Sequence, residues 1–301
     1  MASANAVLRI GAKVPNSGPL PASLGIGAMA AELERAGFDS LWVSDHIVMP
    51  AAISSPYPFA ADGKVTWPTD APYIDAMIAL TAIAAATHRV RIGTAVLVLP
   101  LRQPVVLAKQ AASVDVLSGG RLDLGVGAGW LAEEFAALNV PFAGRGERLD
   151  EWIKVLRAVW TGAPEPFAGR HYTLPAGLHS GPAPAHPIPL LIGGHSGAAR
   201  ARAAAGDGWL AQKSATALDP AELAAATEGM RRAAAAAGRD PDRLRAVLRI
   251  VDSAERIAVV AAALPALTAA GVTEIIVDTD WSVPGSAATA CGQLRAAIAA
   301  A

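Results

Sequence analysis

The chain has 301 residues, with 25 basic and 26 acidic side chains and a formal net charge of -1. This balance provides neither a basic surface for nucleic acid nor an acidic tail. A single cysteine, Cys291, excludes an internal disulfide and a multi-cysteine metal site. The longest apolar helical run, residues 257–272, contains Pro265, which is expected to break it, and falls short of the roughly 18–20 residues of a membrane span.

The first residues, MASANAVLRIG, do not combine a basic stretch with an apolar core, so no secretory signal is predicted. Much of the 53% hydrophobic content is alanine, which raises hydropathy without implying a membrane segment. These features together predict a cytoplasmic enzyme that acts on a small molecule, with no membrane or nucleic-acid partner.

Short apolar segments alternate with helical segments along the whole chain. Strands are predicted at residues 7–14, 40–43, 90–99, 122–126, 190–192, 209–211, 246–251 and 274–277. The helices that follow them include residues 26–36, 74–88, 105–117, 149–160, 197–205, 220–237, 254–270 and 286–300. Strict alternation argues for a parallel sheet, and short apolar runs are typical of strands buried on both faces. The count favours an α/β fold of the (β/α)8 TIM barrel type, formed by residues 1–301 as a single domain, over an open sheet.

Two irregular stretches interrupt the alternation. Residues 49–73 are rich in Pro, Gly, Ser and Asp, and residues 163–188 contain six prolines. Loops of this length inside a compact domain are usually functional. We therefore expect both to be insertion loops over the C-terminal face of the barrel, the first as a lid.

The stretch from Ser118 to Trp152 is the most informative part of the chain. Its apolar strand ends in Gly127, Ala128 and Gly129, where the lack of a Cβ lets backbone N–H groups approach a ligand. A tight turn without a ligand fits the same residues. The spacing of these glycines is not the dinucleotide-binding fingerprint, because the third glycine lies at the wrong offset.

The run GGRLDLGVGAGW, followed by EEF, LNVPF and RGERLDEW, resembles the luciferase-like monooxygenase superfamily. Within it, the chain is most similar to the branch that uses the deazaflavin coenzyme F420. The resemblance continues at residues 42–46, 92–100, 192–194 and 206–209, and so covers nearly the whole chain. It implies an oxidoreductase with coenzyme F420 as cofactor, and FMN as the alternative.

Active sites of such barrels lie at the C-terminal ends of the strands. Asp45 and His46 follow the second predicted strand and are the candidate catalytic acid and base, because histidine titrates near neutrality and a carboxylate can tune it. The alternative remains open that Asp45 caps a turn and His46 packs in a polar layer. The resemblance implies that this pair contacts the deazaflavin.

The cofactor-binding candidates follow strands three, four and five. Gly193, Gly194, His195 and Ser196 precede a helix whose free N–H groups suit an anion, although Ser196 also fits an ordinary N-cap. The resemblance implies that this turn and the Gly127–Gly129 segment hold the phosphate and ribityl tail. It also implies that Thr94, Ala95 and Val96 border the ring, with a non-proline cis peptide between Ala95 and Val96.

Further polar and aromatic side chains at the predicted strand ends are candidates for substrate contact: Lys13, Asn16, Ser17, Trp130 and Lys213. Trp130 stands where sugar-phosphate dehydrogenases of the deazaflavin branch carry a catalytic glutamate, so a sugar phosphate is disfavoured as substrate. Ion pairs are expected among Arg145, Arg148, Asp150 and Glu151. The other histidines lack ligand spacing, and no metal site is predicted.

The predicted reaction is hydride transfer between coenzyme F420 and a small organic substrate, with Asp45 or His46 handling a proton. Two alternatives remain: a two-component monooxygenase that uses reduced FMN and oxygen, and a non-catalytic flavin-binding protein. Relatives of this kind often form homodimers through helices of the outer ring, which is the expectation here. The substrate is expected to be selected by the two insertion loops.

Overall fold

The computed structural model describes residues 7–60 and 62–300. Its main sheet is parallel and follows the order β3-β2-β1-β11-β10-β9-β8-β5-β4, and a further pairing of β3 with β5 closes it into a barrel. The strands of this sheet are β1 (Arg9–Lys13), β2 (Ser40–Val43), β3 (Arg91–Thr94), β4 (Leu97–Val98), β5 (Leu122–Gly127), β8 (Leu190–Gly193), β9 (Gly208–Ser214), β10 (Arg245–Val251) and β11 (Glu274–Val277). The predicted (β/α)8 barrel is confirmed.

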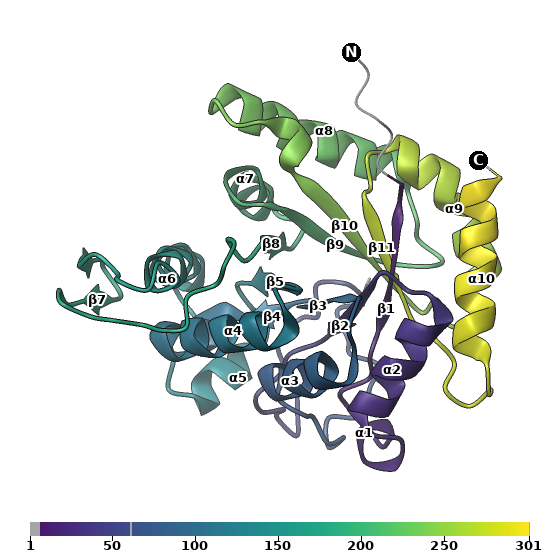
Figure 1. Ribbon diagram of the computed structural model, residues 1–301, viewed down its shortest axis with the longest axis horizontal. Coiled ribbons are helices and arrows are strands. Elements are labelled where there is room, and N and C mark those ends of the chain that lie inside the picture. Colours follow the sequence, from purple (N-terminus) through teal and green to yellow (C-terminus); the bar gives the residue numbers. More distant parts are fainter. Residues whose placement is uncertain (1–6, 61, 301) are drawn as a thin grey trace.

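Helices surround the barrel strands (Figure 1). They are α1 (Leu20–Ser23), α2 (Ile26–Ala36), α3 (Ala76–Ala86), α4 (Pro104–Ser118), α5 (Ala132–Ala137), α6 (Arg145–Val159), α7 (Gly197–Ala205), α8 (Pro220–Ala236), α9 (Ile257–Ala269) and α10 (Ser286–Ala299). Short 3-10 turns occur at Leu99–Leu101 and Pro241–Arg243. Among the described residues, no helix is both long enough and apolar enough to cross a membrane.

Several predicted boundaries were wrong. The single strand predicted at residues 90–99 is divided into β3 and β4 by a cis peptide bond between Ala95 and Val96. Helix α3 begins later than predicted because Asp75 accepts hydrogen bonds from the backbone N–H groups of Met77 and Ile78. Pro265 does not break its helix. It lies on the exposed side of α9, where the ring does not disturb the packing.

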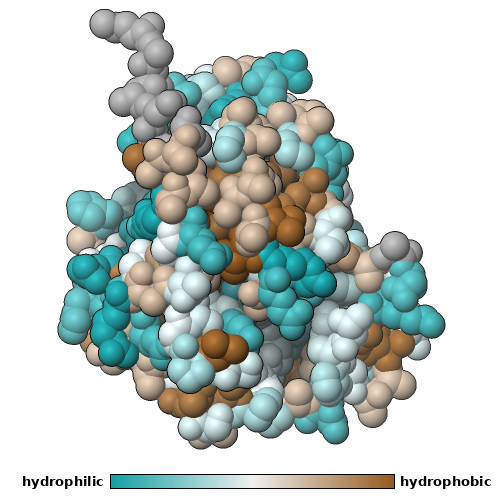
Figure 2. Space-filling view, turned by 90° about the vertical axis from the view of Figure 1, so that its right-hand side faces the viewer, coloured by the Kyte–Doolittle hydropathy of each residue, from teal (hydrophilic) through white to brown (hydrophobic). Residues whose placement is uncertain are grey.

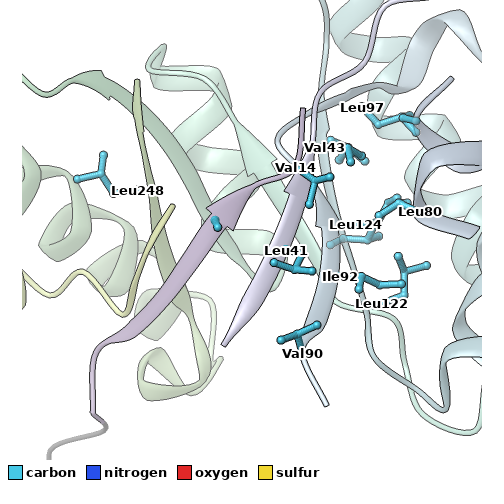
Figure 3. Packing of buried hydrophobic residues seen from close by; sticks show 14 of the residues in the cluster. Val14, Leu41, Val43, Leu80, Val90, Ile92, Leu97, Leu122, Leu124 and Leu248 are labelled. Atoms are coloured by element: carbon cyan, nitrogen blue, oxygen red, sulfur yellow. The ribbon is translucent and has the colours of Figure 1, made fainter. Parts of the chain in front are cut away.

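The main hydrophobic core lies between the barrel and its helices. Figure 3 shows Ile92, Leu122 and Leu124 from β3 and β5 directed toward Leu80 of α3. All four side chains are fully buried. Because successive side chains of a strand point to opposite faces, the residues between them point into the barrel. The surface that carries α9 and α10 is mixed in hydropathy (Figure 2).

The barrel interior has a charged N-terminal end and an apolar middle. Trp42, Leu191, Leu210, Val247 and Ile276 form the apolar cluster. The N-terminal end is formed by ion pairs between strands. Three of them join neighbouring strands: Arg91–Asp123, Arg245–Glu274 and Arg9–Glu274. The fourth, Arg245–Asp123, joins β10 to β5, which are not neighbours in the sheet. Burial alone raises the pKa of Asp123, but the ion pairs with Arg91 and Arg245 outweigh it and lower that pKa.

The two long connections have different structures. Residues 163–188, predicted to be irregular, contain a small hairpin of β6 (Phe167–Ala168) and β7 (Thr173–Leu174). Residues 49–73, of which Ala61 lies outside the described residues, form turns without helix or strand. Glu133 of α5 fastens this segment by accepting hydrogen bonds from the N–H groups of Ser54 and Ser55 at 2.6 and 2.9 Å.

Candidate active site

A cavity of about 650 Å³ opens at the C-terminal ends of the barrel strands. Most of the predicted site residues line it: Ser17, Asp45, His46, Ala95, Val96, Gly127, Ala128, Gly129, Trp130, Gly193, Gly194, His195 and Ser196. The cavity is also lined by Ser44, Tyr57, Tyr73, Arg145, Arg202, Gln212 and Arg249, and of these Arg249 was not predicted. Lys13, Asn16, Thr94 and Lys213 are not among the residues that line it.

His46 is oriented by a carboxylate that the sequence interpretation missed. Its Nδ1 lies 3.0 Å from Oε2 of Glu134, a residue of α5 that is almost fully buried. The other oxygen of Glu134 accepts a hydrogen bond from the N–H of Ile47 at 2.6 Å. A carboxylate at Nδ1 fixes the tautomer with hydrogen on that nitrogen, which leaves Nε2 free to exchange a proton.

Asp45 is engaged in structural contacts. Its Oδ1 pairs with Arg102 at 2.5 Å, and its Oδ2 accepts a hydrogen bond from the N–H of Val98 at 3.0 Å. Arg102 also pairs with Asp75, the N-cap of α3, at 2.6 Å. Burial raises the pKa of Asp45, and Arg102 offsets part of that effect. With both oxygens occupied, Asp45 fixes the position of β4 rather than offering a free base.

The glycines that end β5 and β8 are required by packing against the bend between β3 and β4. A Cβ on Gly127 would lie 2.9 Å from Cγ2 of Val96, and one on Gly193 would lie 2.7 Å from Cγ1 of the same side chain. Thr94 is fully buried, and its hydroxyl donates to the carbonyl of Gly125 at 2.7 Å. These glycines therefore make room for the Val96 side chain at the strand ends, a packing role that the sequence did not reveal.

One end of the cavity suits an anion. Ser196 is the N-cap of α7, and its hydroxyl accepts from the N–H of Ala199 at 3.2 Å, so the simple capping role is confirmed. The first turn of a helix still leaves N–H groups without carbonyl acceptors. Arg145 lines the same cavity, stacked over the Phe142 ring at 3.8 Å. Within the described chain, no carboxylate forms a salt bridge with Arg145.

The predicted ion pairs among Arg145, Arg148, Asp150 and Glu151 are wrong. Asp150 pairs instead with Arg202 of α7 at 2.6 Å. Glu151 accepts hydrogen bonds from backbone N–H groups of residues 170–172. Arg145 is consequently left as a cation that faces the cavity.

Aromatic side chains from residues 49–73 cover the cavity. The Tyr57 ring packs edge-on against Trp67 at 4.9 Å and against Trp130 at 5.1 Å between centroids. The Tyr57 hydroxyl accepts a hydrogen bond from Nε2 of Gln212 at 3.0 Å, which joins this segment to β9. His46 meets Tyr73 and Trp130 edge-on. The wall opposite the strand ends is therefore mainly aromatic.

A model of the luciferase-like monooxygenase family matches residues 15–285, which is most of the chain. This chain belongs to the luciferase-like monooxygenase family. The sequence resemblance is thereby confirmed at the level of the family.

Among relatives of this family member, an uncharacterised protein of Mycobacterium tuberculosis is 41% identical over 182 residues, or 60% of this chain. The matched part spans 63% of that relative. An F420-dependent hydroxymycolic acid dehydrogenase of the same species is 32% identical over 281 residues, covering 86% of this chain and 72% of the relative. An F420-dependent glucose-6-phosphate dehydrogenase of Amycolatopsis mediterranei is 35% identical over 60% of this chain and 51% of its own length.

Solved structures share the fold with this family member. An F420-dependent secondary alcohol dehydrogenase, in complex with an F420–acetone adduct, superposes with a TM-score of 0.75 at 19% identity, over 96% of this chain and 99% of that one. A type II Baeyer–Villiger monooxygenase component from Pseudomonas putida, in complex with FMN, gives 0.72 at 14% identity over 98% of both chains. Identities this low support the barrel fold alone.

The substrate-contact predictions for this family member differ in outcome. Ser17 and Trp130 line the cavity. Asn16 is fully buried and holds the loop ends together, since its amide donates to the carbonyls of Ser44 and Ile74. Lys213 pairs with Glu222 of α8 at 2.5 Å and so points to the outer ring. Asn16 and Lys213 therefore have protein partners for their polar groups, and their contact with substrate stays a prediction.

Proposed function

We propose that the chain is an oxidoreductase that binds coenzyme F420 in this cavity and catalyses hydride transfer between the deazaflavin and a small organic substrate. The observation that carries the proposal is the arrangement of one cavity with Arg145 and the N-terminus of α7 in its lining, together with His46 held by Glu134. The F420-dependent relative that matches 86% of this chain supports the choice of cofactor.

The residues of the cavity fit a phosphate-bearing cofactor. Arg145, Gly193, Gly194 and the first turn of α7 would hold the phosphate, because an arginine without a carboxylate partner and free helical N–H groups are both anion donors. Val96 and the adjacent Gly127–Gly129 segment would border the ring. Bound F420 supplies a ring carbon that accepts or donates hydride in place of the flavin nitrogen.

His46 is the residue proposed to move the proton that accompanies hydride transfer. With Nδ1 bound to Glu134, Nε2 takes a proton from a substrate hydroxyl or returns one to a carbonyl oxygen. The aromatic wall of Tyr57, Trp67 and Trp130 excludes water from the reacting atoms. Asp45 acts in this scheme only through the position of β4.

Titration of the purified protein with coenzyme F420 and, separately, with FMN tests the proposal. We expect F420 to bind at least tenfold more tightly than FMN, with binding measured by fluorescence. Tighter binding of FMN would point to the oxygen-dependent monooxygenase instead. A non-catalytic flavin-binding protein is the other alternative. It replaces the proposal if His46→Ala binds F420 normally and the wild-type protein turns over none of the alcohols and carbonyl compounds screened.

A homodimer formed through the outer helices is also proposed. Helices α3 and α4 pack against each other and carry the exposed apolar side chains Ile78 and Val106. Light scattering after size exclusion tests this, with Ile78→Glu expected to give a monomer if these helices form the contact. A cytoplasmic location likewise remains a proposal, tested by fractionation of the native host.

A further inference from the structure

A second group of charged side chains lies at the ends of three neighbouring strands, away from Arg145. Lys13 ends β1, Arg249 is in β10, and Asp278 follows β11. The register places Ala12 opposite Val277 and Arg249 opposite Ile276, so the three residues lie on adjacent strands of the barrel mouth. They belong to the same inward-facing rows as the interior residues Val247 and Ile276.

This group carries more positive than negative charge. Asp278 pairs with Arg249. Lys13 has no carboxylate within salt-bridge distance among the residues that the structure describes, and its Nζ donates only to neutral acceptors, the carbonyl of Val14 and the Oδ1 of Asn16. Two cations thus share one carboxylate. Burying an excess of positive charge carries a large desolvation free energy unless a further anion pairs with it.

Arg249 connects the group to the cavity. It lines the cavity, although only 7% of the residue is exposed. Its Nη1 donates to the carbonyl of Ile250 at 2.7 Å, and its Nη2 donates to Asp278. A guanidinium has five N–H donors, so donors remain for a ligand in the cavity. Burial and the nearby Arg249 lower the pKa of Lys13 to about 7, with Asp278 opposing them, which agrees with a missing negative partner.

We propose that Arg249 and Lys13 form a subsite for an oxyanion, a carboxylate or a phosphate, carried by an otherwise apolar or aromatic substrate. This inference rests on the proposed function, because it names the substrate class of the same cavity. The aromatic wall of Tyr57, Trp67 and Trp130 provides the complementary surface for the apolar part. Arg249 makes the direct contact, and Lys13 adds charge behind it.

Calorimetric titration of the cofactor-loaded protein with benzoate, phenyl phosphate and the neutral benzamide tests the subsite. We expect benzoate or phenyl phosphate to bind at least tenfold more tightly than benzamide, and the preferred anion to distinguish carboxylate from phosphate. Equal binding of all three compounds, or binding of none, would overturn the proposal. The same titration of the cofactor-free protein separates the two proposals. If the protein does not bind F420 but still binds the anions more tightly than benzamide, only the proposed function is contradicted.

Variants localise the effect. Lys13→Met and Arg249→Gln should each weaken anion binding about tenfold and leave benzamide binding unchanged. Lys213→Met is the matched control, because that lysine lies on the next strand but pairs with Glu222 outside the cavity. If Arg249→Gln does not fold, the double variant R249M/D278N removes the pair without leaving a buried charge. Full anion binding by Lys13→Met and by the double variant would refute the subsite.

Discussion

Glu134 Oε2 lies 3.0 Å from Nδ1 of His46, so α5 decides which ring nitrogen of the histidine is free for a ligand. We expect His46→Ala to lower kcat by about 10²–10⁴ while the affinity for the cofactor is retained, because general acid–base groups contribute in that range. Glu134→Gln should lower kcat by about 10–100-fold without a comparable rise in KM.

Steady-state kinetics separate this role from simple support of the loop. Glu133→Gln is the matched control on the neighbouring position. The Ser55 hydroxyl and the backbone N–H groups of Ser54 and Ser55 lower the pKa of Glu133 to about 2. Loss of the Glu133 carboxylate should make residues 49–73 less ordered and raise KM. Equal effects of both glutamine variants on kcat and KM would contradict the orienting role of Glu134.

Arg145 is expected to be the main cation for the cofactor phosphate. Arg145→Gln should weaken binding of the cofactor by about tenfold or more, since charge-assisted hydrogen bonds to phosphate are among the stronger polar contacts. Arg200→Gln serves as control, because Arg200 lies in α7 but does not line the cavity. Fluorescence titration measures both, and unchanged binding by Arg145→Gln would show that the phosphate lies elsewhere.

Arg102 joins Asp45 and Asp75, and its removal leaves Asp45 buried without a cation. Arg102→Met should lower the free energy of unfolding by about 3–5 kcal/mol, as for other broken buried pairs. Arg157→Met breaks the exposed pair with Asp207 and should cost about 1 kcal/mol or less. Urea denaturation compares the two variants. Similar losses in the free energy of unfolding would mean that the Arg102 ion pairs do not stabilise the fold.

The close packing of Gly193 on Val96 gives a paired test. Gly193→Ala should destabilise the protein by about 1–3 kcal/mol, because its Cβ would meet the Val96 side chain at 2.7 Å. Val96→Ala in the same chain should restore part of that loss. Gly292→Ala, with no atom within 4 Å of the added methyl, is the control and should not destabilise α10. If Gly193→Ala lowers the free energy of unfolding by as much with Val96→Ala as without it, this contact is not the cause of the loss.

The low pKa of Lys13 predicts a pH dependence of stability. Burial, followed by Arg249, lowers that pKa from 10.5 to about 7, so the unfolded chain binds more protons than the folded protein between these values. The free energy of unfolding should therefore rise with pH above 7 relative to that of Lys13→Met. Denaturation at pH 6.5, 7.5 and 8.5 measures the difference, and a difference that does not change with pH would contradict it.

The barrel was predictable because strand and helix periods are local, and all but one of the apolar runs marked a single barrel strand. The division of the third strand was not apparent from composition, since Val90 to Leu99 reads as one apolar segment. The family resemblance predicted the cis peptide between Ala95 and Val96 but not the division of the strand. Likewise, Gly127 indicated a close approach to the backbone and Gly193 an anion-binding turn, but only the structure shows that both glycines pack against Val96.

Side-chain partners were the least predictable part of the site. Glu134 and Glu133 are adjacent in sequence, yet one holds His46 and the other holds Ser54 and Ser55, because neighbouring residues of a helix face different directions. Asp45 and Arg102 are 57 residues apart, and their pairing depends on how β2 and the turn before α4 meet. Such contacts follow from the tertiary arrangement and not from local pattern.

The ion pairs of Asp123 and Glu274 at the N-terminal end of the barrel have a consequence for ligand traffic. Both carboxylates are fully buried among arginines, so the strands do not enclose a through-channel. A ligand of the cavity therefore enters and leaves at the C-terminal end of the barrel. The Tyr57–Gln212 hydrogen bond joins residues 49–73 to β9 at that same end, where both groups line the cavity.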